Sequence, residues 1–224
     1  ISGILQNIAD GNLSILSGFV AFIFDYIICR GLLYNREGSF SDYFRGIKTM
    51  TGKVFLMNIL VGAITVALLT LAALASGAGF LLFSDYAIKD TKIVISLIVL
   101  FTLVMIFTSL IFAYLNFFMA DERYRDLPFF DSLKLILKAG IKLFSESFMA
   151  GVKAYKITLL TGVIALVTGI LSMKAPAAAV FAIIFGVIAA IALFLCTPPF
   201  RASLSDIYMD RAEEIYNEVM GCED

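Results

Sequence analysis

Residues 93–120 read IVISLIVLFTLVMIFTSLIFAYLNFFMA and contain no acidic or basic side chain. A run of 18 or more apolar residues with few charges is typical of a transmembrane helix. At about 1.5 Å per residue, a helix over this run is roughly 42 Å long, which exceeds the ~30 Å hydrocarbon core of a bilayer. We therefore expect a span that tilts or extends beyond the bilayer.

Four other stretches have the same character, at about 13–34, 54–76, 155–173 and 178–196. The last is followed by Thr197-Pro198-Pro199, where we expect the helix to stop because proline lacks a backbone donor. The predicted fold is an all-α polytopic membrane helix bundle over residues 1–200, followed by a tail helix at 201–224. The chain begins at Ile1 with five spans, and we expect a sixth, earlier span in the full protein.

The composition supports membrane insertion and argues against several kinds of chemistry. Hydrophobic residues make up 61% of the 224, charged residues 16%, and the mean hydropathy is +0.96. Soluble domains have about a quarter charged residues. Histidine is absent, the three cysteines form no CxxC pair, and no GxSxG, P-loop or dinucleotide-binding glycine motif occurs. We therefore expect no catalysis, metal or cofactor, and with a net charge of −1 no nucleic-acid partner.

The distribution of lysine and arginine predicts the orientation. Thirteen of these residues lie after the first, third and fifth spans, and three (Lys89, Lys92 and Lys174) lie in the other loops. Basic loops stay on the cytoplasmic side. We expect a multi-pass protein of the cell membrane, with the N-terminus of this chain outside and its C-terminus in the cytoplasm.

One charged phrase occurs twice. REGSFSDYFRGIK at 36–48 matches RDLPFFDSLKLIL at 125–137 without a gap, and at the same offset Lys53 matches Lys142. Each copy follows a span that runs inward, which indicates a parallel internal repeat. The phrase either sets the topology of the bundle or binds lipid headgroups or a partner. The basic residues available for such contacts are Arg36, Arg45, Lys48, Lys53, Arg125, Lys134, Lys138 and Lys142.

The second copy leads into a predicted interfacial helix at about 129–150. At about 100° per residue, Asp131, Ser145, Glu146 and the three lysines at 134, 138 and 142 share one arc of about 120°. Apolar residues fill most of the remaining circumference. Such a helix lies at the membrane surface with its lysines toward the phosphates of anionic inner-leaflet lipids.

Asp25, Arg30, Asn58 and Asn116 are the candidate polar site residues within the spans. Asp25 interrupts the first span, where an unpaired carboxylate is costly, so it should face the bundle interior, a wet cavity or a partner. Either it forms an ion or proton site or a polar anchor, or it is neutral or paired with Arg30. Asn58 and Asn116 are expected to hydrogen-bond between helices.

The tail at 201–224 carries seven acidic residues, and its apolar residues keep the spacing of an amphipathic helix. It serves either as a docking site for a partner or as a cap on the basic loops of the same bundle.

REGSFSDYFRG (36–46) before one span, and ADERYRDLPFFDSLKLILKAG (120–140) after another, resemble a group of bacterial and archaeal multi-spanning families. The group includes uncharacterised six-span proteins and the membrane domain attached to some glycerophosphodiester phosphodiesterases. Phe130-Asp131-Ser132 replaces the small residues that usually open the second stretch. The resemblance implies an all-helical membrane module and does not extend to the phosphodiesterase activity.

Two functions remain as hypotheses. The first is a non-enzymatic module, acting as a scaffold, an accessory or regulatory subunit, or an organiser of lipid, with a membrane-protein partner or a second copy of itself. The alternative is a transporter of ions or small solutes that uses Asp25 at mid-membrane.

Overall fold

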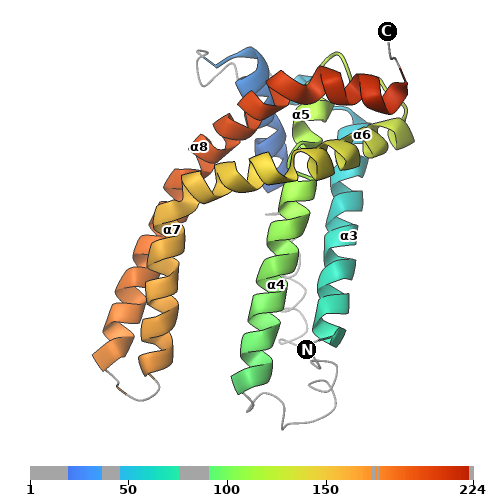
Figure 1. Ribbon diagram of the computed structural model, residues 1–224. Helices are drawn as coiled ribbons and strands as arrows, with labels where there is room; N and C mark the ends of the chain where they lie inside the picture. The colour runs from blue at the N-terminus through green and yellow to red at the C-terminus, as the bar shows by residue number, and fades with distance from the viewer. Residues whose placement is uncertain (1–19, 37–45, 76–90, 173–174, 176, 222–224) are drawn as a thin grey trace, which may run out of the picture. The chain divides into compact units, whose positions relative to one another are not determined.

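The computed structural model describes residues 20–36, 46–75, 91–172, 175 and 177–221, and the regular elements among them are all helices (Figure 1). Four helical stretches are long and apolar enough to cross a membrane: Gly52–Ala75, Ile98–Ala120, Phe144–Ser172 and Ala177–Met220. The chain therefore has the helices of a membrane protein. Of the predicted first span, residues 20–34 are helical and residues 13–19 lie outside the described residues.

The chain divides into two compact units, one of residues 1–141 and 214–224 and the other of residues 142–213. In the first unit the described elements are a helix at 20–34, the 3₁₀ turn η1 (Gly46–Thr49), α3 (Gly52–Ala75), α4 (Thr91–Ile111), α5 (Leu115–Ala120) and α6 (Phe129–Lys142). Residues 214–220 of α8 also belong to it.

The core of this first unit lies around α5. Helix α3 packs against both α4 and α5. All six residues of α5 are buried, and its neighbour Tyr114 is fully buried as well. By contrast, apolar residues along α3 and α4, such as Val66 and Phe107, are more than half exposed. A large apolar surface of this kind is what lipid covers in a membrane protein.

The predicted long span at 93–120 is interrupted. Helix α4 ends at Ile111, three turn residues follow, and α5 begins at Leu115. Within the interruption, backbone hydrogen bonds run from Ala113 to Leu110 and from Leu115 to Phe112, each to the third residue back. Such short i→i+3 turns interrupt the α-helical hydrogen-bond pattern, so the stretch predicted as one span consists of two helices, α4 and α5.

Helix α6 packs against this break. A Cβ atom on Gly140 would overlap the backbone carbonyl of Ile111, the last residue of α4. The axis of α6 runs across those of α3 and α4 (Figure 1). Glycine at this position allows the two backbones to approach so closely.

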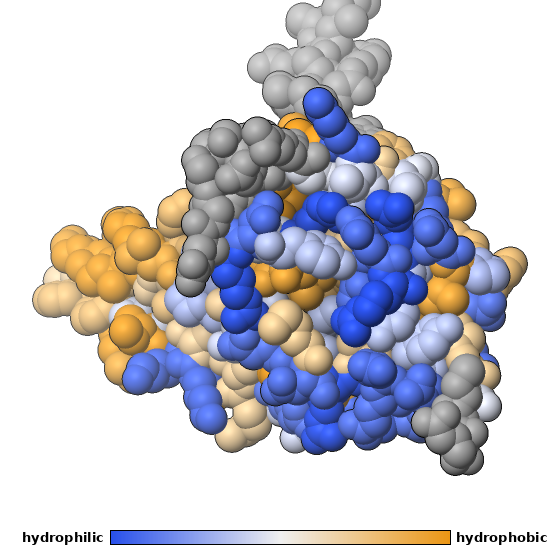
Figure 2. All heavy atoms as spheres, turned by 90° about the horizontal axis from the view of Figure 1, so that it is seen from above, coloured by the Kyte–Doolittle hydropathy of each residue, from blue (hydrophilic) through white to orange (hydrophobic). Residues whose placement is uncertain are grey.

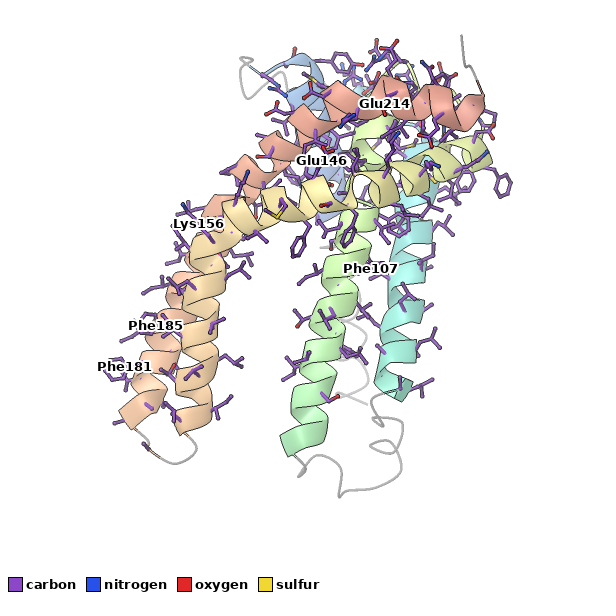
Figure 3. All side chains as sticks on the ribbon, viewed as in Figure 1. Phe107, Glu146, Lys156, Phe181, Phe185 and Glu214 are labelled. Atoms are coloured by element: carbon purple, nitrogen blue, oxygen red, sulfur yellow. The ribbon has the colours of Figure 1, made fainter. Side chains whose placement is uncertain are left out.

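The second unit is a hairpin of α7 (Phe144–Ser172) and α8 (Ala177–Met220) up to residue 213. The Tyr155 hydroxyl lies 3.4 Å from the Thr197 hydroxyl, and the Tyr155 ring centroid lies 5.2 Å from that of Phe200. Arg211 lies 3.5 Å from Glu146. The two helices therefore run antiparallel. Phe181 and Phe185 project from α8 on the side away from α7 (Figure 3).

Three predicted helical stretches have other boundaries in the structure. Residues 129–150, predicted as one interfacial helix, fall in two helices, because α6 ends at Lys142 and α7 begins at Phe144. The spans predicted at 155–173 and 178–196 are parts of longer helices. In particular, α8 continues through Pro198 and Pro199 into the predicted tail.

Proline bends α8 and does not terminate it. The helix changes direction partway along its length (Figure 1), as helices that contain proline do. Side chains occupy backbone acceptors on either side of the pair: the Thr197 hydroxyl donates to the Leu193 carbonyl at 2.8 Å, and the Ser203 hydroxyl donates to the Pro199 carbonyl at 3.1 Å. The prediction that the helix stops here was wrong: α8 continues to Met220, although Pro198 and Pro199 cannot donate to the carbonyls of Phe194 and Leu195 four residues earlier.

Candidate functional site

Three of the four polar residues predicted within the spans, Asp25, Asn58 and Asn116, form one hydrogen-bonded chain. The Nδ2 amide of Asn116 donates to Oδ2 of Asp25 at 2.6 Å. The Nδ2 amide of Asn58 donates to Oδ1 of Asn116 at 3.1 Å and to the Val54 carbonyl at 2.9 Å. The expected bond between Asn58 and Asn116 is therefore present, and the chain extends to the carboxylate.

Three different elements supply this chain. Asp25 comes from the helix at 20–34, Asn58 from α3 and Asn116 from α5. Asn116 is the central member, with 6% of its surface exposed. A carboxylate has about four acceptor positions, of which the amide of Asn116 uses one at Asp25. Among the described residues, no group of three or more acidic or cysteine side chains could hold a metal ion.

Arg30 lies one helical turn beyond Asp25 and binds a different acid. Its guanidinium donates to the Ala120 carbonyl at 3.3 Å and forms an ion pair of 3.0 Å with Glu122. It also lies 5.2 Å from the centroid of the Tyr34 ring. Pairing with Asp25 was one of the alternatives left open by the sequence; Arg30 instead joins the helix at 20–34 to the end of α5 and to Glu122.

The segment after α5 contains further polar residues that the sequence analysis did not single out. The Asp121 side chain is 3% exposed and forms an ion pair with Arg123 at 2.8 Å. The Tyr34 hydroxyl donates to Asp121 at 3.2 Å and accepts the backbone N–H of Glu122 at 3.0 Å. These residues could have been found from the sequence by the high density of charged residues in ADERYR (120–125), which directly follows an uncharged run.

Lys53 has an internal role in place of the predicted contact with lipid. Its ammonium donates to the carbonyls of Arg125 and Leu127, at 2.8 and 2.5 Å. The start of α3 is therefore fastened to the second copy of the repeated phrase. A lysine that serves two backbone acceptors in this way has one donor left for other ligands.

The remaining predicted contact residues have varied surroundings. Arg36 donates to the Leu32 carbonyl at 2.8 Å, Arg125 lies 3.5 Å from Asp126, and Lys48 is exposed on η1. Lys134 and Lys142 are exposed on α6. Arg45 lies outside the described residues. Hydrophilic side chains gather on the face shown in Figure 2, with hydrophobic ones toward its edges.

Helix α6 has three distinct faces. One face, which includes Leu135, Ile136 and Gly140, is buried. Phe130 and Ile141 are 78% and 65% exposed, and at about 100° per residue they lie only about 20° apart around the helix. The lysines at 134, 138 and 142 occupy the next arc, about 80° wide. Exposed apolar and cationic side chains therefore lie next to each other on the outer side of α6.

The acidic C-terminal part of α8 contacts α6 and the segment that precedes it. Lys138 forms an ion pair of 2.9 Å with Glu218, and the rings of Tyr124 and Tyr216 lie 5.0 Å apart. Ile215, which precedes Tyr216 in α8, is fully buried. Residues 215–218 thus cover basic surface of the same chain, which was one of the two roles considered for the tail.

Between α7 and α8 lies an open groove within the second unit. Its floor includes Met149, Ala150, Ala154 and Ile207, and its polar side chains are those of Ser145, Glu146, Lys153, Ser203 and Asp206. Side chains of both charges therefore line it.

Comparison of the chain with protein-family models, with curated proteins and with solved structures finds no match.

Proposed function

We propose that this chain is a non-enzymatic multi-pass membrane module that organises anionic lipid at the cytoplasmic surface and acts there as a scaffold or accessory subunit. The proposal includes five spans, a C-terminus in the cytoplasm and a parallel repeat of the basic phrase. The contact of Lys53 with the Arg125 carbonyl supports the placement of both copies on one side. The resemblance to multi-spanning membrane modules agrees with this role.

One observation carries the proposal: the adjacent apolar and cationic faces of α6. Phe130 and Ile141 are too exposed to contribute to the core, and their burial in the acyl boundary removes them from water. The lysine arc then lies at the depth of the lipid phosphates, because long lysine side chains extend toward the headgroups. Each lysine near an anionic leaflet contributes about 1 kcal/mol. We propose on this basis that α6 is an amphipathic interfacial helix.

Two lysines of α6 form a matched pair for a test. Lys134 is exposed, whereas Lys138 forms the ion pair with Glu218, which already satisfies part of its charge. In nanodiscs or doped micelles, we expect Lys134→Gln to weaken binding of phosphatidylglycerol about fivefold, from the ~1 kcal/mol of one lysine. Lys138→Gln should weaken it less. Equal affinity of the wild type for phosphatidylglycerol and phosphatidylcholine would contradict the proposal.

The second candidate function is transport of a proton or small cation, and the chain from Asp25 to Asn58 favours it. Ionisable residues within spans are expensive and often mark ion pathways. In proteoliposomes, a transporter requires that Asp25→Asn abolish flux while the variant keeps its helical content. A wild-type protein without flux of protons, sodium or potassium would eliminate this candidate.

A further inference from the structure

We infer that the groove between α7 and α8 binds the headgroup of an aminophospholipid such as phosphatidylethanolamine. This goes beyond the proposed function, because it concerns another lipid class at another site, and it shares only the premise of membrane insertion. The groove belongs entirely to residues 142–213. The basis for this inference is the order of basic and acidic side chains along the groove.

The groove begins where the apolar part of the hairpin ends. Lys153 and Lys156 are the last charged residues of α7 before its uncharged run begins at Ile157, and Pro199 closes the apolar part of α8. In the uncharged parts of both helices, on the far side of Lys156 and Pro199 from the groove, exposed side chains such as Leu160 and Phe194 are apolar. Acyl chains of a lipid in the groove can therefore continue along the hairpin.

The charges follow in a fixed order away from the apolar part. Lys153 comes first, and Glu146 lies seven residues nearer the start of α7, about 10 Å along the helix axis. Because α8 runs antiparallel, Asp206 lies beyond Ser203 and Pro199 in the same outward direction. Side chains on a helix lean toward its N-terminus, so Lys153 on α7 leans outward and Asp206 on the antiparallel α8 leans back toward it, which brings these two groups closer together.

An aminophospholipid presents the complementary order. Its phosphate is next to the acyl chains, and its primary ammonium lies two carbons farther out. The phosphate matches Lys153, and the ammonium, with three N–H donors, matches the carboxylates of Glu146 and Asp206. The Ser203 hydroxyl donates to the Pro199 carbonyl and can still accept a hydrogen bond.

The existing partner of Glu146 does not exclude this contact. The ion pair with Arg211 is 3.5 Å long, and both side chains are 46% exposed. Exposed ion pairs of this kind contribute little. The carboxylate of Glu146 also has more acceptor positions than one guanidinium contact uses.

Phosphatidylcholine provides the decisive comparison, because it has the same charges and acyl chains but a quaternary ammonium without N–H donors. With the full chain in mild detergent, native mass spectrometry should show phosphatidylethanolamine bound about tenfold more tightly than phosphatidylcholine, as expected for charge-assisted hydrogen bonds. Glu146→Gln combined with Asp206→Asn should reduce this preference to less than about twofold. Lys153→Gln should weaken both lipids by a similar factor, while the neighbouring variant Lys156→Gln should change neither.

Three results would overturn the inference: equal binding of the two lipids by the wild type, an unchanged preference in the double variant, or equally effective competition by soluble glycerophosphoethanolamine. Circular dichroism of each variant establishes that it is folded. Single variants Asp206→Asn and Glu146→Gln, each expected to lower the preference partly, provide the test if the double variant is unstable. Phosphatidylglycerol binding by Lys134→Gln, measured in parallel, reports on α6 alone and separates failure of this inference from failure of the proposed function.

Discussion

The side-chain amide of Asn116 lies 2.6 Å from the carboxylate of Asp25, although 91 residues separate them in the chain. Asn116 is buried, and it receives a second bond from Asn58. One asparagine therefore joins the helix at 20–34, α3 and α5. This arrangement accounts for a carboxylate within an apolar span, because its polar partners come from neighbouring helices.

Asn116→Ala should destabilise the protein more than Asn58→Ala. The first removes a donor from Asp25 and an acceptor from Asn58, and buried polar groups that lose partners cost about 1–3 kcal/mol. The second removes one interhelical bond, worth about 0.6 kcal/mol. Unfolding in mixed micelles measures the loss of stability in each variant. In the double variant Asn58→Ala/Asn116→Ala, the loss should differ from the sum of the two single losses. Strict additivity would mean that the three residues do not act as one network.

Gly140→Ala should disrupt the packing of α6 on α4, because a Cβ atom would overlap the Ile111 carbonyl. We expect a loss of about 2 kcal/mol or more, since backbone must shift. Gly62 in α3 is the matched control, because its Cβ position has open space. Gly62→Ala should be neutral or stabilising by about 1 kcal/mol. Thermal unfolding compares the two, and equal midpoints would show that α6 does not pack as described.

Arg30→Ala should be more damaging than Glu122→Gln. The arginine side chain is 18% exposed and contacts a backbone carbonyl, a carboxylate and an aromatic ring. The glutamate is 58% exposed, and an exposed ion pair contributes about 0–1 kcal/mol. We expect Arg30→Ala to cost about 2–3 kcal/mol, as for a charged hydrogen-bonding group. Chemical denaturation in micelles measures the free energy of unfolding of each variant. Equal losses in the two variants would mean that the ion pair with Glu122 is the contact that matters.

Lys53→Met should loosen the segment at 121–128, whereas Lys48→Met should not. Lys53 donates to two backbone carbonyls there, and Lys48 is exposed. Hydrogen exchange of the amides at 124–127 should accelerate about tenfold in the first variant, corresponding to loss of about 1.4 kcal/mol. If hydrogen exchange at 124–127 accelerated equally in both variants, the cause would be the loss of a positive charge and not the loss of the bonds from Lys53.

The sequence was sufficient for the helical class and for the positions of the apolar stretches. A run such as 93–120 has no alternative to a helix in a bilayer, because its backbone must be satisfied internally. Asn58 and Asn116 were also identifiable, since amides in spans tend to pair. Periodicity could not reveal that α4 stops at Ile111, because the break depends on packing around α5 and Gly140.

The partners of charged residues were harder to predict. Lys53 and Lys134 have the same chemistry in sequence, yet one donates to backbone carbonyls and the other is exposed. Arg30 was considered as a partner for the nearby Asp25, but its carboxylate partner is 92 residues away. The continuation of α8 through Pro198 and Pro199 could not be predicted from the two prolines alone.

We propose that α6 rests at the surface of the bilayer, and the accessibility of spin labels along it can measure this placement. Single cysteines at positions 130, 134 and 141 would be labelled, in a protein whose three native cysteines are replaced, and reconstituted in vesicles containing phosphatidylglycerol. We expect labels at 130 and 141 to be accessible to oxygen and protected from a water-soluble nickel complex. The label at 134 should be accessible to the nickel complex and less accessible to oxygen. Equal accessibility to nickel at all three positions would contradict it.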